Sequence, residues 1–361
     1  MKKERNSNFE LLRIFAMLMI VMHHYICHGG FVFDKALTFN KVVSECAYWG
    51  GKVGINLFVL ITGYFMVKGT WKLSKVLVLY GEILFYSWLI SIFFVLIGWE
   101  PISIQGIIKM VFPFLIPRHN YTTTYIMLYM SIPFINKFIY SLSKKSIQFL
   151  IAWLSVILIF IPSIMELYIG WTNNVYSYLI WMIYIYICGA YIRLYGKKWE
   201  VKMSLTGSIL SIVALWMLTV FVGQFTNINP YYFASKTYSI PVVVTSLFIF
   251  KFFENLNIKH NKYINYVASS TFAVYLIHDD KLFRNNVWTK VFKGNALLSS
   301  NCLVINIILT TLIVFIFAII IDKVRIMLQR PIFNYFNSND YIAGIREKIK
   351  CMCTKIADIN L

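Results

Sequence analysis

Four ionisable side chains lie within one apolar stretch near the start of the chain. The residues from Glu10 to His24 read Glu-Leu-Leu-Arg-Ile-Phe-Ala-Met-Leu-Met-Ile-Val-Met-His-His. On insertion scales an ionisable group in a membrane-spanning helix costs about 2.5 to 3.5 kcal/mol, so such groups mark functional sites by default. A carboxylate, a guanidinium and two imidazoles in this stretch therefore indicate a functional site, and the imidazoles suit acid–base chemistry.

The spacing of these residues assigns them to helix faces. Arg13 and His24 are separated by about 1100° of helical rotation, roughly 20° from three full turns, and by a rise of about 16 Å. They therefore share one face of the predicted helix. Glu10 precedes Arg13 by three residues and can form an ion pair with it, although the same two residues would also suit anchoring at the cytoplasmic headgroups. His23 points about 100° away from His24, so we expect the two imidazoles to have different roles.

The composition is that of a membrane protein with many spans. The 361 residues have a mean hydropathy of +0.67, with 59% hydrophobic and 14% charged residues. The net charge of +19 would suggest a nucleic-acid partner in a soluble protein, but the enrichment of cytoplasmic loops in Lys and Arg explains it without one. No small-residue cleavage site follows the first apolar stretch, so we expect a retained span and not a signal peptide. The six cysteines show no metal-binding or disulfide spacing, and we expect no metal and no bound cofactor.

Hydropathy predicts an all-α fold with about ten transmembrane helices. The candidate spans cover residues 9–28, 49–67, 76–98, 120–140, 147–168, 175–194, 204–223, 237–253, 264–282 and 297–322. Every second connection, together with both ends of the chain, carries more than twice as many lysines and arginines as the opposite connections. Both termini are therefore expected in the cytoplasm. We predict one domain over residues 1–325 and a short basic cytoplasmic tail over 326–361, with an interfacial or re-entrant piece at 102–116.

Polar residues occur at specific places in two later spans. In the second span, the Thr62-Gly63 step allows another backbone to approach closely. Asn56 in the same span needs a partner for its amide and is a candidate for binding a sugar or a catalytic imidazole. His278 lies near the outer end of the ninth predicted span, in the leaflet that His24 approaches. With Asp279, Asp280 and Arg284 nearby, the two histidines predict a polar pocket, although the same charges would also suit a cluster solvated in the headgroups.

A resemblance to a known family rests on four motifs that occur in order along the chain. They are Glu-Leu-Leu-Arg with ten residues between Arg13 and His24, Phe-Val-Leu-Ile-Thr-Gly-Tyr-Phe ending at Phe65, Tyr-Ile-Met-Leu-Tyr-Met-Ser-Ile-Pro-Phe-Ile-Asn ending at Asn136, and Tyr-Leu-Ile-His ending at His278. This series resembles the acyltransferase-3 family of bacterial integral membrane acyltransferases over residues 9 to about 322. The His-Asp-Asp sequence from His278, with Arg284 and Trp288 behind it, is similar to the subset associated with O-acetylation of surface polysaccharides.

The resemblance implies an enzyme that takes an acyl group, usually acetyl from acetyl-CoA on the cytoplasmic side, and delivers it to a saccharide hydroxyl. It implies that His24 is the catalytic imidazole and that Arg13 is its basic partner in the same motif. A paired Arg-x-x-Arg of the family has no match, because Arg118 stands alone. This difference affects the predicted binding of the acyl donor.

The resulting candidates divide into two groups. The catalytic candidates are Glu10, Arg13, His24 and His278, and the substrate-binding candidates are His23, Asn56, Arg118, Tyr125 and Arg284. A neutral imidazole can remove the proton of a hydroxyl as it attacks a thioester, or can accept the acyl group itself. Arg13 can bind the phosphates of coenzyme A, or it can pair with Glu10 as a gate or orienting group.

The leading hypothesis is a multi-pass enzyme of the bacterial plasma membrane that acylates a capsular or other cell-surface polysaccharide, or its lipid-linked precursor. Its partners are then acyl-CoA, the saccharide and membrane lipid, with no nucleic acid. The alternative is a transporter or flippase for a lipid-linked saccharide, in which the intramembrane Arg and His line a pathway. A polysaccharide polymerase is the third hypothesis and the least favoured, because such an enzyme would carry larger outer loops than the sequence predicts.

Overall fold

The structure, a computed structural model, describes residues 5–32, 37–113, 119–163, 178–226, 229 and 231–338. Within these ranges the chain is all helix and loop, which confirms the predicted all-α class. The helices are α1 (Ser7–His28), α2 (Phe39–Ala47), α3 (Gly50–Met66), α4 (Leu73–Leu96), α5 (Ile104–Val111), α6 (Asn120–Ser141), α7 (Lys144–Ser155), η1 (Val156–Phe160), α9 (Tyr178–Tyr195), α10 (Val201–Phe225), α11 (Ile240–Asn255), α12 (Lys262–Ala268), α13 (Thr271–His278), α14 (Lys281–Phe283), η2 (Arg284–Phe292), η3 (Gly294–Leu297) and α15 (Leu303–Ser338).

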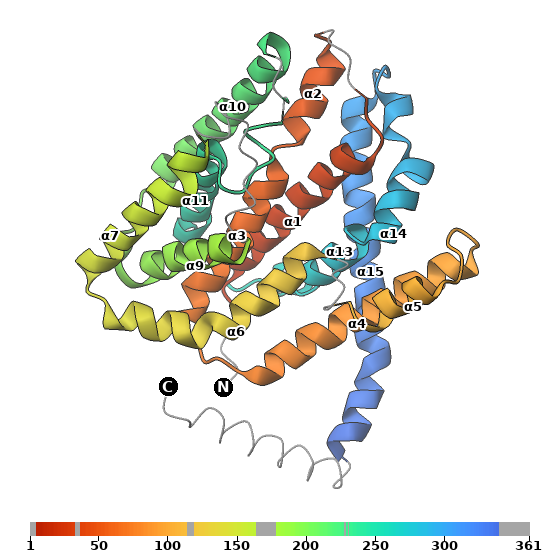
Figure 1. The fold of residues 1–361 in the computed structure, drawn as a ribbon, viewed down its shortest axis with the longest axis horizontal. Helices are drawn as coiled ribbons and strands as arrows, with labels where there is room; N and C mark the ends of the chain where they lie inside the picture. Colours follow the sequence, from red (N-terminus) through yellow and green to blue (C-terminus); the bar gives the residue numbers. More distant parts are fainter. Residues whose placement is uncertain are drawn as a thin grey trace.

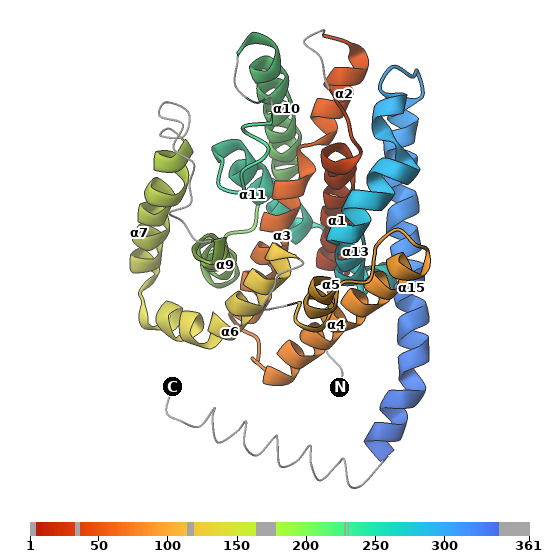
Figure 2. The same cartoon turned by 45° about the vertical axis from the view of Figure 1, so that its right-hand side comes forward.

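Helix α1, which carries the ionisable residues, lies in the middle of the bundle (Figure 1). It packs against α3, α11, α12, α13 and α15. Helices α7, α9, α10 and α11 lie on one side of it and α4, α13 and α15 on the other, in both views (Figure 2). The helix thus has protein on most sides, which is where polar groups at membrane depth find partners.

Capping residues define both ends of α1. The side chain of Asn6 accepts a hydrogen bond from the backbone N–H of Asn8, which satisfies one of the unpaired donors of the first turn. At the other end, the backbone N–H of Gly29 donates to the carbonyl of Tyr25. The predicted span over 9–28 therefore lies within one uninterrupted helix of 22 residues, Ser7–His28.

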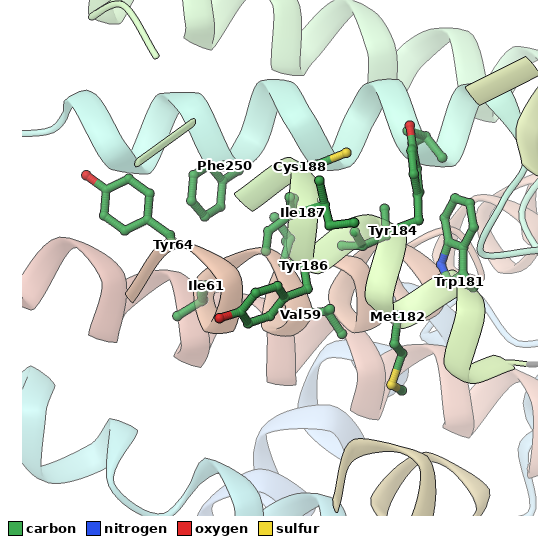
Figure 3. Close-up of a cluster of buried hydrophobic side chains, with 14 of the residues drawn as sticks. Val59, Ile61, Tyr64, Trp181, Met182, Tyr184, Tyr186, Ile187, Cys188 and Phe250 are labelled. Atoms are coloured by element: carbon green, nitrogen blue, oxygen red, sulfur yellow. The ribbon is translucent and has the colours of Figure 1, made fainter. Parts of the chain in front are cut away.

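Glycines allow α3 and α9 to pack backbone to backbone, as the Thr62-Gly63 step predicts. A Cβ atom at Gly63 would lie 2.2 Å from the carbonyl oxygen of Tyr186, and one at Gly189 would lie 2.4 Å from that of Leu60. Around this contact Tyr64, Tyr186 and their apolar neighbours form a buried cluster (Figure 3). Close approach of small residues is the main source of attraction between helices in lipid, where the hydrophobic effect is absent.

The number of spans is supported only in part. Six helical segments of the described chain are long and apolar enough to cross a membrane, namely Ser7–His28, Leu73–Leu96, Lys144–Ser163, Tyr178–Tyr195, Val201–Phe225 and Leu303–Pro331. Helices α3 and α11 have 17 and 16 residues, short of the roughly 20 that a perpendicular span needs. Helix α6 has 22 residues, but its first two turns contain three consecutive threonines and it is not among these six. The count of ten and the orientation of the termini stay predictions.

The ninth predicted span is not a continuous helix. It divides into α12 and α13 at Ser269 and Ser270. There the hydroxyl of Ser269 donates a hydrogen bond to the carbonyl of Tyr266, and the hydroxyl of Thr271 donates to the carbonyl of Ala268, in place of backbone N–H groups. The ammonium group of Lys323 donates to the Tyr266 carbonyl as well, at 2.8 Å. A break inside an apolar run is tolerated where side chains satisfy the freed backbone groups in this way.

Two further predictions concern the edges of the fold. The predicted interfacial piece at 102–116 contains the short helix α5, none of whose residues is buried. Helix α15 runs on through Ser338, past the predicted domain boundary at residue 325. Residues 339–361 of the predicted tail lie outside the described part of the chain.

Candidate active site

Two histidines from distant parts of the sequence meet where α1 and α13 end. The Nδ1 atom of His24 lies 2.9 Å from the Nε2 atom of His278. His278 is fully buried, whereas the side chain of His24 keeps 13% of its surface exposed. The two residues, predicted to lie in the same leaflet, are therefore in direct contact. Of the two, only His24 is accessible to a ligand.

Donor and acceptor chemistry assigns the protons of this pair. Nδ1 of His278 lies 2.6 Å from the carbonyl oxygen of Val274, which can only accept, so this nitrogen carries the proton. Nε2 of neutral His278 is then an acceptor, and Nδ1 of His24 must donate to it. The lone pair of His24 is left on Nε2, which has no hydrogen-bond partner among the described residues.

A carboxylate completes the environment of His24. Asp279 Oδ1 lies 3.2 Å from the same Nδ1 atom, and its side chain is only 3% exposed. Arg284 forms an ion pair with this carboxylate from the π-helical segment η2. When His24 takes up a proton, the imidazolium therefore forms next to an anion. A base held by a hydrogen bond at its other nitrogen and stabilised by a carboxylate has the arrangement used in nucleophile–base–acid triads.

The local structure after α13 explains how one short segment supplies both groups. Helix α13 ends at His278, and the backbone N–H of Asp279 caps it by donating to the carbonyl of Tyr275. Asp280 then begins α14, its side chain accepting from the backbone N–H of Leu282. The indole N–H of fully buried Trp288 donates to the His278 carbonyl at 3.2 Å, which fixes the turn.

His23 makes contacts of its own, as the 100° offset predicts. Its Nδ1 atom lies 2.6 Å from the carbonyl oxygen of Tyr48, and its Nε2 atom lies 3.3 Å from the sulfur of Cys27. The ring also packs on Tyr48, with 4.2 Å between ring centroids. A Cβ atom at Gly51 would lie 2.3 Å from this imidazole, so only glycine leaves room for it.

Arg13 lies at the other end of α1 and borders a cavity. It pairs with Glu10 at 2.9 Å, so the predicted ion pair is present, and its guanidinium side chain stays 33% exposed. A cavity of about 210 Å³ is lined by Arg13, Tyr125 and Tyr275, among others. Tyr275 belongs to α13, whose C-cap residue Asp279 contacts His24, so the cavity reaches the helix that carries these groups.

One set of side chains near His24 has the donors of a metal site. Ligand atoms of His24, His28 and Asp279 lie within 4.8 Å of one another. Two imidazoles and a carboxylate suit a first-row divalent ion such as zinc. The Oδ1 atom of Asp279 already pairs with Arg284 and lies 3.2 Å from Nδ1 of His24, so a metal ion bound through this oxygen would have to displace those contacts.

Comparison with known families identifies the class of protein. The family described as an acyltransferase domain matches residues 6–322. The chain belongs to the acyltransferase-3 family. No curated protein and no solved structure matches it. An acyltransferase needs an acyl donor and an acceptor. The cavity at Arg13 and the imidazole of His24 are therefore the places in this acyltransferase to consider for donor binding and for the transfer itself.

Two further predicted site residues of this acyltransferase, Asn56 and Tyr125, contact residues other than His24. The amide of Asn56 donates to the carbonyl of Thr237 at 2.8 Å and accepts from the indole of Trp181 at 3.0 Å, so it joins α3 to its neighbours. The hydroxyl of Tyr125 lies 3.0 Å from that of Thr62, beside the Arg13 cavity. Arg118 is outside the described residues. Roles for Asn56, Tyr125 and Arg118 in substrate binding stay predictions.

Three residues beside the candidate site had no assigned role in the sequence prediction: Asp279, Cys27 and His28. Asp279 was expected in a polar pocket with Asp280 and Arg284, but its contact with His24 was not predicted. Cys27 follows His23 by four residues, the helical spacing that brings side chains together, and this signal was available. His28 has the same spacing from His24 and completes the set of imidazoles.

Proposed function

We propose that this acyltransferase transfers an acetyl group from acetyl-CoA to a hydroxyl of a cell-surface polysaccharide or of its lipid-linked precursor, in the bacterial plasma membrane with both termini cytoplasmic. The single observation that carries the proposal is the geometry of His24. Its Nδ1–H is held by His278 and Asp279, and its Nε2 lone pair is directed away from both. A hydroxyl is a poor nucleophile at neutral pH, and such a base removes its proton during attack.

The same geometry favours a general base over an acyl-accepting nucleophile. Proton uptake gives an imidazolium, and the carboxylate of Asp279 at 3.2 Å stabilises that cation. An acylated imidazole is likewise cationic, but its formation would occupy the nitrogen that the acceptor hydroxyl needs. His24 therefore takes the proton and His278 holds the ring in the required tautomer.

Arg13 and its cavity suit the donor. The guanidinium is partly exposed at the cavity while Glu10 holds one edge of it, so its remaining N–H groups can bind phosphate oxygens of coenzyme A. Tyr125 and Tyr275 give the cavity apolar walls along which a pantetheine arm can lie. Donor binding and acid–base chemistry then occupy opposite ends of α1, about 16 Å apart along the helix.

The test is the O-acetyl content of surface polysaccharide, measured by NMR in a deletion strain that carries plasmid-borne variants. The wild-type gene should restore the O-acetyl signal and His24→Ala should not, at equal protein level in the membrane. His260→Ala is the matched control, because His260 is exposed and lies away from the candidate site. A wild-type O-acetyl signal from His24→Ala would overturn the proposed role.

The transporter hypothesis makes a different prediction. A flippase would move a lipid-linked saccharide and would not release coenzyme A from acetyl-CoA with any acceptor. Membership of the acyltransferase family favours the enzyme, and release of coenzyme A by the purified protein separates the two hypotheses directly.

A further inference from the structure

A thiol and an imidazole next to His24 form a second reactive pair. The sulfur of Cys27 lies 3.3 Å from Nε2 of His23. Nδ1 of His23 lies 2.6 Å from the carbonyl oxygen of Tyr48, which can only accept, so the proton of neutral His23 is on Nδ1. Nε2 of His23 is therefore the acceptor in the contact with Cys27, and the thiol is the donor.

This is the arrangement of an activated nucleophile. A nucleophile, a base within hydrogen-bond reach of it and a third group that orients the base are the three parts that recur in covalent catalysis. Here they are Cys27, His23 and the carbonyl of Tyr48. Gly51 fixes the ring from the other side, because a side chain there would collide with it.

The thiol of the pair is accessible and lies near the face of α1 that carries His24, whereas the imidazole of His23 is buried. Cys27 is exposed, and it lies about 60° around the helix from His24, between His24 and His23. Neither His23 nor Cys27 has a task in the base mechanism of His24.

We propose that Cys27 carries the acetyl group as a thioester between donor and acceptor, an inference that rests on the proposed function. The thiol of Cys27 attacks the carbonyl carbon of acetyl-CoA while Nε2 of His23 takes its proton. The bond from that carbon to the coenzyme A sulfur breaks, and the leaving thiolate recovers the proton. The products are S-acetyl-Cys27 and coenzyme A, so one thioester replaces another and no further reactant is needed.

The second half of the cycle uses His24. The acceptor hydroxyl loses its proton to Nε2 of His24 and attacks the acetyl carbon on Cys27. The carbon–sulfur bond breaks, the acetyl ester forms, and the proton removed from the hydroxyl ends on the Cys27 sulfur. Two imidazoles on adjacent residues thus serve two successive transfers, and steady-state kinetics should be of the ping-pong type.

The test is to incubate the full-length protein in lipid nanodiscs with radiolabelled acetyl-CoA and no acceptor. Wild type should become acetylated, with the label removed by neutral hydroxylamine and mapped by mass spectrometry to the peptide containing Cys27. Cys27→Ala should lose the label, and its acetyl transfer should fall by at least about 100-fold, the lower end of what a positioned catalytic group contributes. Cys302→Ala, which removes another exposed cysteine, should behave as wild type.

A second measurement avoids dependence on a variant that fails to fold. Acetyl-CoA, but not coenzyme A, should protect Cys27 of the wild-type protein from iodoacetamide. Transfer at the wild-type rate by Cys27→Ala, or absence of both label and protection in active wild-type protein, would overturn the relay. If His24→Ala is inactive while Cys27→Ala is fully active, the relay fails and the proposed function stands; if wild type releases no coenzyme A with any acceptor, the proposed function fails.

Discussion

His278 accepts a hydrogen bond from His24 across 254 residues of sequence, with 2.9 Å between the two nitrogens. The backbone carbonyl of Val274 fixes the tautomer of His278, and His278 in turn fixes that of His24. The chemistry of the partly exposed imidazole of His24 is therefore set by a carbonyl that is two hydrogen bonds away. This relay explains why a fully buried histidine lies at the end of an apolar helix.

Loss of His278 should impair catalysis more than donor binding. His278→Ala removes the acceptor that holds the proton of His24 on Nδ1, so a fraction of His24 adopts the inactive tautomer. We expect kcat to fall by about 10- to 100-fold, with KM for acetyl-CoA within about twofold of wild type. Steady-state transfer assays on purified protein measure both constants. An unchanged kcat would show that His278 only fills space.

The carboxylate of Asp279 should matter for the charged state of His24. Asp279→Asn keeps the size of the side chain and removes the charge beside the imidazolium. We expect a fall in kcat of at least about 10-fold, because the cation formed by proton uptake loses its partner. Asp280→Asn is the matched control, since the side chain of Asp280 caps α14 by accepting a hydrogen bond from the backbone N–H of Leu282. Equal effects of the two variants would argue for a structural role.

Arg13 should determine affinity for the donor. A hydrogen bond to a charged group contributes about 1.5 to 3 kcal/mol, so Arg13→Ala should raise KM for acetyl-CoA by roughly 10- to 100-fold. Arg13→Lys should restore part of this affinity, because lysine supplies charge without the paired donors. Isothermal titration of coenzyme A against the purified variants measures the same effect without catalysis. Wild-type affinity in Arg13→Ala would place the donor elsewhere.

The glycine contact between α3 and α9 should control folding. Gly63→Ala places a methyl group 2.2 Å from the carbonyl oxygen of Tyr186, and overpacking of this kind costs about 1 to 3 kcal/mol. We expect a lower melting temperature by fluorescence-detected thermal unfolding in detergent. Gly81→Ala is the control, because a Cβ atom at Gly81 has nothing within 4 Å and should leave the melting temperature unchanged or raised.

Metal ions should inhibit and not activate. The lone pair of His24 is the working base in this account, so treatment with EDTA should leave the transfer rate unchanged. Zinc at micromolar concentration should lower the rate by occupying His24, His28 and Asp279, and His28→Ala should relieve that inhibition. Loss of activity on chelation, restored by one metal, would instead make this cluster a metal centre.

Helical spacing in the sequence correctly predicted which side chains of one helix lie close together. The shared face of Arg13 and His24, the Glu10 ion pair and the close approach at Gly63 all follow from residues a few turns apart or from side-chain size. The division of the ninth span was not predicted from the sequence. The hydroxyls of Ser269 and Thr271 and the ammonium group of Lys323 satisfy the backbone there, and these contacts depend on the fold.

Contacts between distant elements were outside the reach of sequence reasoning. The amide of Asn56 was expected to need a partner, and it has two, but nothing in the sequence distinguished Trp181 and Thr237 from a sugar or an imidazole. The pairing of His24 with His278 was expected only as a shared leaflet. Direct contact depends on how α1 and α13 pack, which a single sequence leaves open.

The most direct test of the central claim is acetyl transfer by purified protein in nanodiscs, with acetyl-CoA as donor and an oligosaccharide of the native surface polysaccharide as acceptor. The account predicts that His24→Ala lowers the rate of O-acetyl formation by about 10² to 10⁴, the contribution of a positioned general base, and that His260→Ala does not lower it. Transfer by His24→Ala at the wild-type rate would contradict the assignment of His24 as the base of this acyltransferase.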